Sequence, residues 1–260
     1  MKLSLILGHK LLGFFGIVLS ILLMWQLCIW FFQPPTWLFP SPSEVYIRFV
    51  SLWQAQAIQH HIIITLVEIV LGYLLGIGLG FISGYPISQV RTLEKLLTPY
   101  LIAANSIPLV AFAPLLLLWF GNGISTKIIV TALIVYFPVT ISTISGFHQQ
   151  EPLEIRLMHT LRASKWQLFI YLELPSAAPG ILAGLKIAAP LAVVGAVVGE
   201  FLGTGEGLGH LILEANGLLD TAQLFVAIII LALVGISFYL TTVALETLIL
   251  GNWHHKRRLS

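Results

Sequence analysis

Long apolar runs constrain this chain more than any other feature. A helix needs about 20 predominantly apolar residues to cross the hydrocarbon core of a bilayer, and runs of this length recur from end to end. Hydrophobic residues make up 58% of the 260 residues and charged residues only 9%, which is too little charge to cover a soluble domain of this size. The runs are continuous, without the alternation of membrane β-strands. The sequence therefore predicts an all-α, polytopic membrane protein.

Six transmembrane helices are expected, within a single transmembrane domain over residues 1–260. The predicted spans are 11–32, 62–83, 97–120, 128–146, 181–202 and 223–250. The first run is expected to stay as a permanent helix, because no small-residue cleavage site follows it. The third contains Pro99, Pro108 and Pro114, which predict an irregular helix because each proline removes a backbone donor and clashes with the preceding turn.

Basic residues fall mostly on one side of these spans. The side that holds both termini carries Lys2, Lys10, Arg91, Lys95, Arg156, Arg162, Lys165, Lys186, Lys256, Arg257 and Arg258. Only Arg48 and Lys127 fall on the other side. Because basic loops stay in the cytoplasm, we expect both termini to be cytoplasmic. The basic tail 254–258 is then a contact for lipid headgroups in the bilayer, and no nucleic-acid partner is expected.

Two segments predict surface and packing roles. The outer segment 33–61 is rich in proline and then contains a helix-compatible run, 44–53, for which Ser43 is the expected cap; aromatic residues favour an interfacial position for it. In the second span, Gly72, Gly76, Gly80 and Gly84 recur every four residues. This spacing places them on one helix face, where another backbone can approach closely.

Polar side chains within the spans are the candidates for a transport pathway. They are Glu68, Asn105, Ser106, Thr140 and Thr143. A charge at the depth of Glu68 is costly, so it either lines a pathway or pairs with a neighbouring helix, and both readings remain open. The hydroxyls have the alternative of satisfying their own backbone. Glu200 lies near the outer end of its span, where a backbone amide is the expected partner.

Catalytic machinery is not predicted. The glycine-rich turn with Gly203, Gly205, Gly207 and Gly209 lacks the preceding strand of a dinucleotide site, and no phosphate loop ending in Gly-Lys-Ser/Thr occurs. The histidine pairs 60–61 and 254–255 lack metal-site spacing, and no nucleophile motif is present. We expect neither an enzyme nor a bound cofactor or metal.

The polar loop 147–180 between the fourth and fifth spans predicts two short helices. Glu151-Pro152 favours a helix start, because proline at the first helical position loses no bond, and this helix is expected to reach Arg162. Ser164 and Gln167 predict a capping box for a second helix. Pro175 and Pro179 are expected to bend the chain into the fifth span.

This loop resembles the cytoplasmic coupling loop of ABC importer permeases, especially the nitrate, sulfonate, taurine and bicarbonate group. The matching pieces are residues 163–169, Leu174-Pro175, Ile107-Pro108, Pro114-Leu115, Trp119-Phe120-Gly121, Phe137-Pro138, Gly199-Glu200-Phe201 and Gly207-Leu208-Gly209. The resemblance runs from about residue 41 to the C-terminus. Two departures are Arg156-Leu157-Met158 in place of Glu-Ala-Ala, and Arg162 in place of the glycine, where a β-carbon restricts the turn.

The resemblance implies a type I, binding-protein-dependent importer in the bacterial inner membrane. Its expected partners are ABC ATPase subunits that bind the ATP, a periplasmic or lipoprotein substrate-binding protein, and a second permease copy in a homodimer. The docking surface for the ATPase is expected at Arg156, Leu157, His159, Leu161 and Arg162.

Two alternatives remain open. Similar permeases import heterocyclic vitamins or their precursors, of the riboflavin or thiamine-pyrimidine type. A secondary transporter or channel driven by an ion gradient would use Glu68 or Glu200 as an ion site. Against it, six spans are few for internal repeats, and no half of the sequence matches the other.

Overall fold

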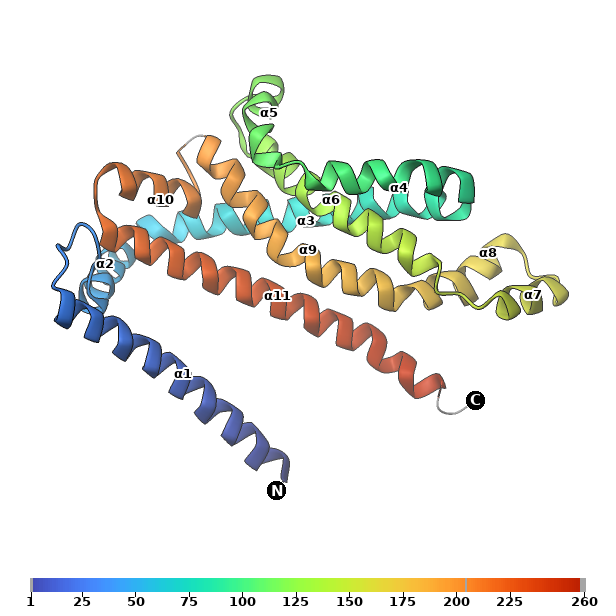
Figure 1. Cartoon of the computed structure of the whole chain (residues 1–260), viewed down its shortest axis with the longest axis horizontal. Coiled ribbons are helices and arrows are strands. Elements are labelled where there is room, and N and C mark those ends of the chain that lie inside the picture. The colour runs from blue at the N-terminus through green and yellow to red at the C-terminus, as the bar shows by residue number, and fades with distance from the viewer. Residues whose placement is uncertain (1, 204, 258–260) are drawn as a thin grey trace. The chain divides into compact units, whose positions relative to one another are not determined.

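The computed structural model describes residues 2–203 and 205–257, and within them it contains helices and connections but no strand. In chain order the elements are α1 (Lys2–Phe32), α2 (Pro42–Gln54), α3 (Ala57–Gln89), α4 (Arg91–Ser106), η1 (Leu109–Ala111), α5 (Ala113–Phe120), α6 (Ile124–Phe147), α7 (Pro152–Thr160), α8 (Lys165–Leu168), η2 (Phe169–Glu173), α9 (Leu174–Leu202), α10 (Leu208–Gly217) and α11 (Thr221–Arg257) (Figure 1). The all-α prediction is confirmed.

Four helical segments of the described chain are long and apolar enough to cross a membrane. They are Ala57–Gln89, Ile124–Phe147, Lys165–Leu202 and Thr221–Ile249. A shorter apolar helix, Gly16–Phe32, matches part of the first predicted span. The predicted third span is divided among α4, η1 and α5, so the number of six spans stays a prediction.

The chain divides into two compact units, and each is described by itself. The first holds the chain up to His60 together with Leu211–Ile230; the second holds His61–His210 and the chain from Leu231 onward. In the first unit the rings of Trp25, Phe39 and Phe225 pack together, with centroids 5.3 to 6.0 Å apart. Arg48 there forms an ion pair with Asp220 at 2.7 Å.

Helix α2 begins at Pro42, two residues earlier than the sequence suggested. Ser41, not Ser43, is the cap: its hydroxyl accepts from Glu44 N, and the Glu44 carboxylate accepts from Ser41 N at 2.7 Å. Pro42 occupies the first helical turn, where its missing donor costs nothing, and this places Glu44 at the third helical position that a capping box requires.

In the second unit, the glycine face of α3 packs on α6. A β-carbon at Gly76 would lie 2.7 Å from the carbonyl oxygen of Ala132, and one at Gly80 would lie 2.8 Å from Val139. Gly72 and Gly84 meet Thr131 and Thr143 in the same way. The predicted packing role of these glycines is confirmed, because any larger side chain would push the two backbones apart.

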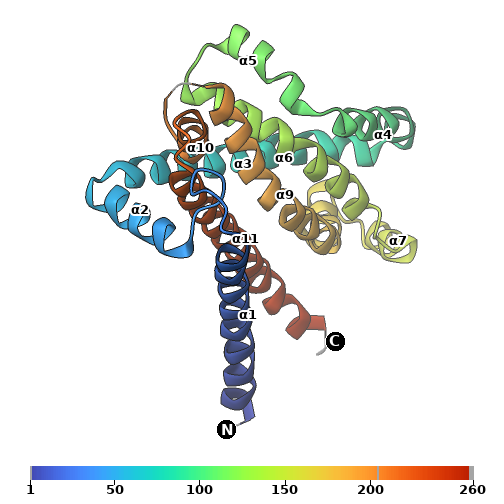
Figure 2. The same cartoon turned by 60° about the vertical axis from the view of Figure 1, so that its left-hand side comes forward.

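The predicted third span breaks at one of its three prolines. Pro99 is tolerated inside α4 and Pro114 lies in the first turn of α5, whereas the chain at Ile107-Pro108 leaves the helical conformation. The direction of the chain changes between α4 and α5 (Figure 2). The predicted irregularity is confirmed. The next turn lies at Gly121-Asn122-Gly123, where Gly121 has φ +80°.

The connection into the fifth span differs from the prediction. Pro175 and Pro179 do not bend the chain out of helix; instead α8, a π-helical segment η2 and α9 follow one another without interruption. Leu174 N donates to Phe169 O, five residues back. This wider turn accommodates Pro175, which cannot donate a backbone bond and would crowd the carbonyl of an α-helical turn.

Candidate functional site

A buried ion pair joins α3 to α6 in the second unit. Lys127 Nζ lies 3.0 Å from Glu68 Oε1, and the two side chains are 3% and 0% exposed. The same ammonium donates to the carbonyl oxygen of Glu206 at 2.9 Å. Glu68 therefore has a partner on a neighbouring helix, which was one of the two possibilities that the sequence left open. Sequence reasoning missed Lys127 in this role, although a lone basic residue at the edge of an apolar run was the available signal.

Glu200 holds the glycine-rich turn between α9 and α10. Its Oε2 accepts from Gly209 N at 2.6 Å, which agrees with the expected backbone partner, and its Oε1 accepts from the Thr65 hydroxyl at 2.5 Å. Leu208 N donates to Thr65 Oγ1 at 2.8 Å. Gly207 has φ +105°, and a β-carbon there would lie 1.9 Å from Glu200. The turn thus encloses a carboxylate of its own chain.

Glu68, Lys127 and Glu200 belong to one buried polar network. It links α3, α6 and α9 to the turn before α10 through the Lys127–Glu68 ion pair and through charge-assisted hydrogen bonds, which are stronger than neutral ones. Charged groups in a low-dielectric interior are costly unless each has a partner. The network therefore connects these helices. The Glu68 carboxylate takes part through its ion pair with Lys127, and neither of its oxygens has a hydrogen-bond partner among the described residues. Among the described residues, no group of three or more His, Cys, Asp or Glu is placed to hold a metal ion.

A cavity lies at the break in the third predicted span. It encloses about 240 Å³, and its lining residues are Ala104, Asn105, Ile107, Pro108, Leu109, Val110, Ile134, Phe137, Leu191 and Val194. Of these lining residues, Asn105 is the one with a polar side chain. Irregular backbone at membrane depth is tolerated where it lines such a space.

The other candidate pathway residues lie elsewhere. Ser106 is exposed and donates to Ile102 O at 3.0 Å. Thr140 is fully buried and donates to Tyr136 O at 2.7 Å, and Thr143 is buried against Gly84. Glu68 is buried in its ion pair. Asn105 is the one candidate among the five that lines the cavity, and the pathway roles of all five stay predictions.

The polar loop forms the expected helix pair. α7 ends at Thr160, two residues earlier than predicted, and is closed by a Schellman motif in which Arg162 N donates to His159 O and Ala163 N donates to Met158 O. Arg162 has φ +54°, the left-handed conformation that glycine adopts most easily. The turn expected for a glycine is therefore formed with arginine in its place.

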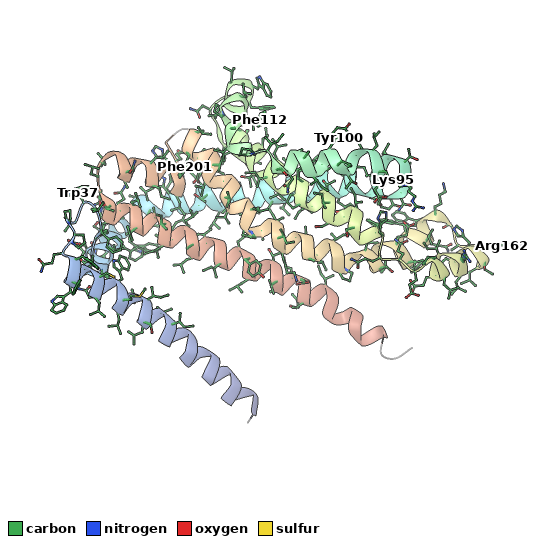
Figure 3. The ribbon with its side chains drawn as sticks, in the orientation of Figure 1. Trp37, Lys95, Tyr100, Phe112, Arg162 and Phe201 are labelled. Carbon is green, nitrogen blue, oxygen red and sulfur yellow. The ribbon has the colours of Figure 1, made fainter. Side chains whose placement is uncertain are left out.

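The second helix of the pair has its predicted cap. Ser164 Oγ accepts from Gln167 N at 3.3 Å, and Gln167 Oε1 accepts from Ser164 N at 2.8 Å. Arg162 lies at the tip of this helix pair (Figure 3). The five residues expected to dock the ATPase are all exposed, and the apolar ones are conspicuous: Leu157 is 58% and Leu161 is 68% exposed. Exposed leucines on a polar helix are typical of a protein interface.

These features define a class of protein: a helical, multi-pass membrane protein with a broken span beside a cavity and an exposed helix pair. The chain belongs to the family described as the binding-protein-dependent transport system inner membrane component, whose model matches residues 76–250. It is a permease subunit of an ABC importer, as the resemblance in its loop implied.

Relatives of this chain carry the same description. It is 38% identical over 223 residues to a probable ABC transporter permease protein of Haemophilus influenzae, covering 86% of this chain and 90% of that one. It is 36% identical to a formylaminopyrimidine transport permease of Halalkalibacterium halodurans, covering 92% and 94% of the two chains. It is 33% identical to a putative aliphatic sulfonates transport permease of Bacillus subtilis, covering 75% and 71%.

The fold has a counterpart among solved structures. A crystal structure of an amino acid ABC transporter with histidines superposes with a TM-score of 0.58 at 18% identity, over 77% of this chain and 96% of that one. At this identity the likeness concerns the fold alone. It agrees with the helical, multi-pass architecture described above.

Proposed function

We propose that two copies of this chain form the membrane pathway of an importer that separate ATPase subunits drive and a substrate-binding protein supplies. The observation that carries the proposal is the exposed helix pair α7–α8. Leu153, Leu157 and Leu161 are 58 to 73% exposed on an otherwise polar element, and exposed apolar area of this kind favours burial against a partner.

The partner that fits this surface is a cytoplasmic ATPase subunit. The excess of basic residues on the side of the termini supports a cytoplasmic position for α7. Arg156, His159 and Arg162 are exposed on the same helix pair and add cationic or polar groups, a combination that suits an acidic, partly apolar groove. Closure of the ATPase dimer on ATP would displace the docked helices and switch the pathway between inward-facing and outward-facing arrangements.

The test is purification of the chain with its candidate ATPase subunit, followed by uptake in proteoliposomes. We expect a stable complex and uptake that needs ATP inside with the binding protein outside. A protonophore should leave initial uptake unchanged. Uptake that collapses with the ion gradient, by this chain without an ATPase subunit, would contradict the proposal in favour of a secondary transporter.

A small anion of the nitrate, sulfonate, taurine or bicarbonate type is the first candidate substrate. The similarity to an aliphatic sulfonates permease supports it. In this class of importer the binding protein selects the substrate, so the pathway itself needs only to let it pass.

A heterocyclic vitamin or vitamin precursor is the second candidate, and three observations favour it. The relative named for formylaminopyrimidine is more similar over more of the chain than the sulfonate relative. In addition, Lys127 and Lys186 within the described spans are already engaged, the first by Glu68 and the second by Glu246 at 2.8 Å. The cavity at Asn105 offers an apolar wall and one amide, which suit a neutral ring better than an anion.

A direct binding screen distinguishes the two candidates. Isothermal titration is carried out on the binding protein encoded beside this chain, with taurine, nitrate, riboflavin and formylaminopyrimidine as separate ligands. We expect either the anions or the heterocyclic compounds to bind, but not both. Uptake of the bound compound should then fall about 2- to 10-fold in Asn105→Leu, because one hydrogen bond is worth about 0.5–1.5 kcal/mol. Ser106→Ala is the matched control, since Ser106 bonds its own helix outside the cavity.

A further inference from the structure

Four elements contribute rings to an aromatic cluster at the base of the helix pair. The ring of Tyr85, near the end of α3, lies 4.9 Å from that of Phe147 at the end of α6 and 5.0 Å from that of Phe169 in η2. Trp166 of α8 stacks on Phe169 at 5.8 Å. Ring pairs at these separations attract one another beyond simple burial. The cluster therefore ties the base of the helix pair to two other helices.

One polar contact within this cluster crosses from α3 to η2. The Tyr85 hydroxyl donates to Glu173 Oε2 at 3.1 Å, and Glu173 is only 8% exposed. A hydrogen bond to a carboxylate is stronger than one between neutral groups. Neither residue belongs to the docking surface or to the cavity, so the transport role described above leaves both unexplained.

Glu173 occupies a particular place in the chain. It is the last residue of the π-helical segment, which lies between the docked helix pair and the long α9. A π-helical turn is less regular than an α-helical one and is often found at functional sites. A displacement applied at α8 can therefore be absorbed in this segment before it reaches α9, unless something anchors its far end.

We propose that Tyr85 and Glu173 are a positioning pair that carries the displacement of the helix pair to α3. This inference rests on the proposed function. The pair anchors the end of η2 to α3, and the glycine face of α3 is packed on α6 at Gly76 and Gly80. With the anchor in place, a movement of α8 moves α3 and α6 together with α9. Without it, the movement is taken up in the π-helical segment.

The experiment uses the full chain in complex with its ATPase subunit in lipid nanodiscs. The native Cys28 is replaced by Ser, and a spin label is attached at Ile82→Cys, a position of α3 that is 70% exposed. The electron-spin distance between the labels of the two copies is measured without nucleotide and after trapping with Mg-ATP and orthovanadate. The ATPase rate is measured on the same samples.

We expect trapping to change the distance in the parent chain and this change to be lost in Tyr85→Phe, which keeps the ring contacts but removes the hydroxyl. Glu173→Met should lose it too, whereas Glu173→Gln should keep it, because its amide oxygen still accepts from Tyr85. The ATPase rate should be retained in all three variants. Tyr73→Phe is the matched control on the same helix: it loses a hydroxyl that donates to Leu185 O at 2.9 Å, beyond the π-helical segment, and should keep the distance change.

The outcomes separate the inference from the function on which it rests. If the parent chain responds and Tyr85→Phe responds equally, the positioning role is overturned while the importer assignment stands. If Tyr85→Phe and Tyr73→Phe lose the distance change equally, the positioning role is also overturned. The loss would then follow from removing any hydrogen bond of α3, and would not be specific to the contact with Glu173. A parent chain that neither retains the ATPase subunit nor responds to nucleotide overturns the proposed function itself.

Discussion

Lys127 and Glu68 face each other across the contact between α6 and α3, with Nζ and Oε1 3.0 Å apart and both side chains buried. Two charges that leave water together cost little when they are well paired, but a single charge left behind costs several kcal/mol. The two helices can therefore pack here at low cost only when both charges are present and paired.

Lys127→Met is expected to destabilise the permease by about 3–5 kcal/mol, because it leaves the Glu68 carboxylate buried without its partner. The double variant Glu68→Leu/Lys127→Met should recover much of this loss. Unfolding in detergent, followed by circular dichroism, measures both. Lys186→Met is the matched control: its pair with Glu246 is 31% and 15% exposed, so about 1 kcal/mol or less is expected. If Lys127→Met and Lys186→Met lose the same amount of stability, burial of the Lys127 pair does not make its loss more costly.

Gly76→Ala and Gly78→Ala should change the stability of the permease in opposite directions. A β-carbon at Gly76 would lie 2.7 Å from the Ala132 carbonyl, so we expect a loss of about 1–3 kcal/mol from forced separation of α3 and α6. Nothing lies within 4 Å of the same atom at Gly78, where alanine should stabilise the helix by up to about 1 kcal/mol. Thermal unfolding of the purified variants is the measurement. A neutral Gly76→Ala would mean that the helices relax apart without cost.

Arg162→Gly should stabilise the turn between α7 and α8 relative to Arg162→Ala. Both variants lack the cation, but only alanine keeps a β-carbon at φ +54°, and the expected difference is about 1 kcal/mol. Chymotrypsin cleavage near Trp166 reports opening of the turn, and should be about fivefold slower in the glycine variant. Equal cleavage rates in Arg162→Gly and Arg162→Ala would show that a β-carbon in the left-handed conformation does not destabilise this turn.

Leu157→Asp and Leu161→Asp are expected to weaken association with the ATPase subunit while membrane insertion stays intact, because each places a charge in an apolar interface. Pull-down of the ATPase subunit from membranes measures the effect; a loss of at least about 2 kcal/mol, or roughly 30-fold in affinity, is expected if these are central contacts. Leu218→Asp is the control, an equally exposed leucine, at 67%, between α10 and α11. Unchanged affinity in all three would refute the docking assignment.

Local signals were sufficient for several elements of the fold. Ser164 and Gln167 predicted their capping box because its partners are three residues apart, and the Gly72 to Gly84 series predicted a packing face because helix geometry alone places these residues together. Where two local signals competed, the prediction was wrong: Ser43 was chosen as a cap although Ser41 precedes Pro42 and stands three residues before Glu44.

Long-range partners were not accessible in the same way. No local rule joins Lys127 to Glu68, or Glu200 to Thr65, because these residues come from different helices whose rotation is set by packing. The π-helical segment was missed for a related reason. Prolines in sequence predict a bend, whereas helices that pack on both ends of a segment can hold the chain helical and let one wider turn absorb the missing bond.

The sequence by itself determined that the chain is helical and membrane-spanning, because hydropathy and charge are properties of each segment and lipid tolerates few backbone structures. It also determined that the third predicted span is irregular and that a capped helix pair precedes the fifth. Only the tertiary structure decided which polar residues inside the spans are paired, that Asn105 lines a cavity, and that Tyr85 reaches Glu173. These depend on how helices distant in sequence rotate and pack, and that is set by the sum of many weak contacts rather than by any one segment.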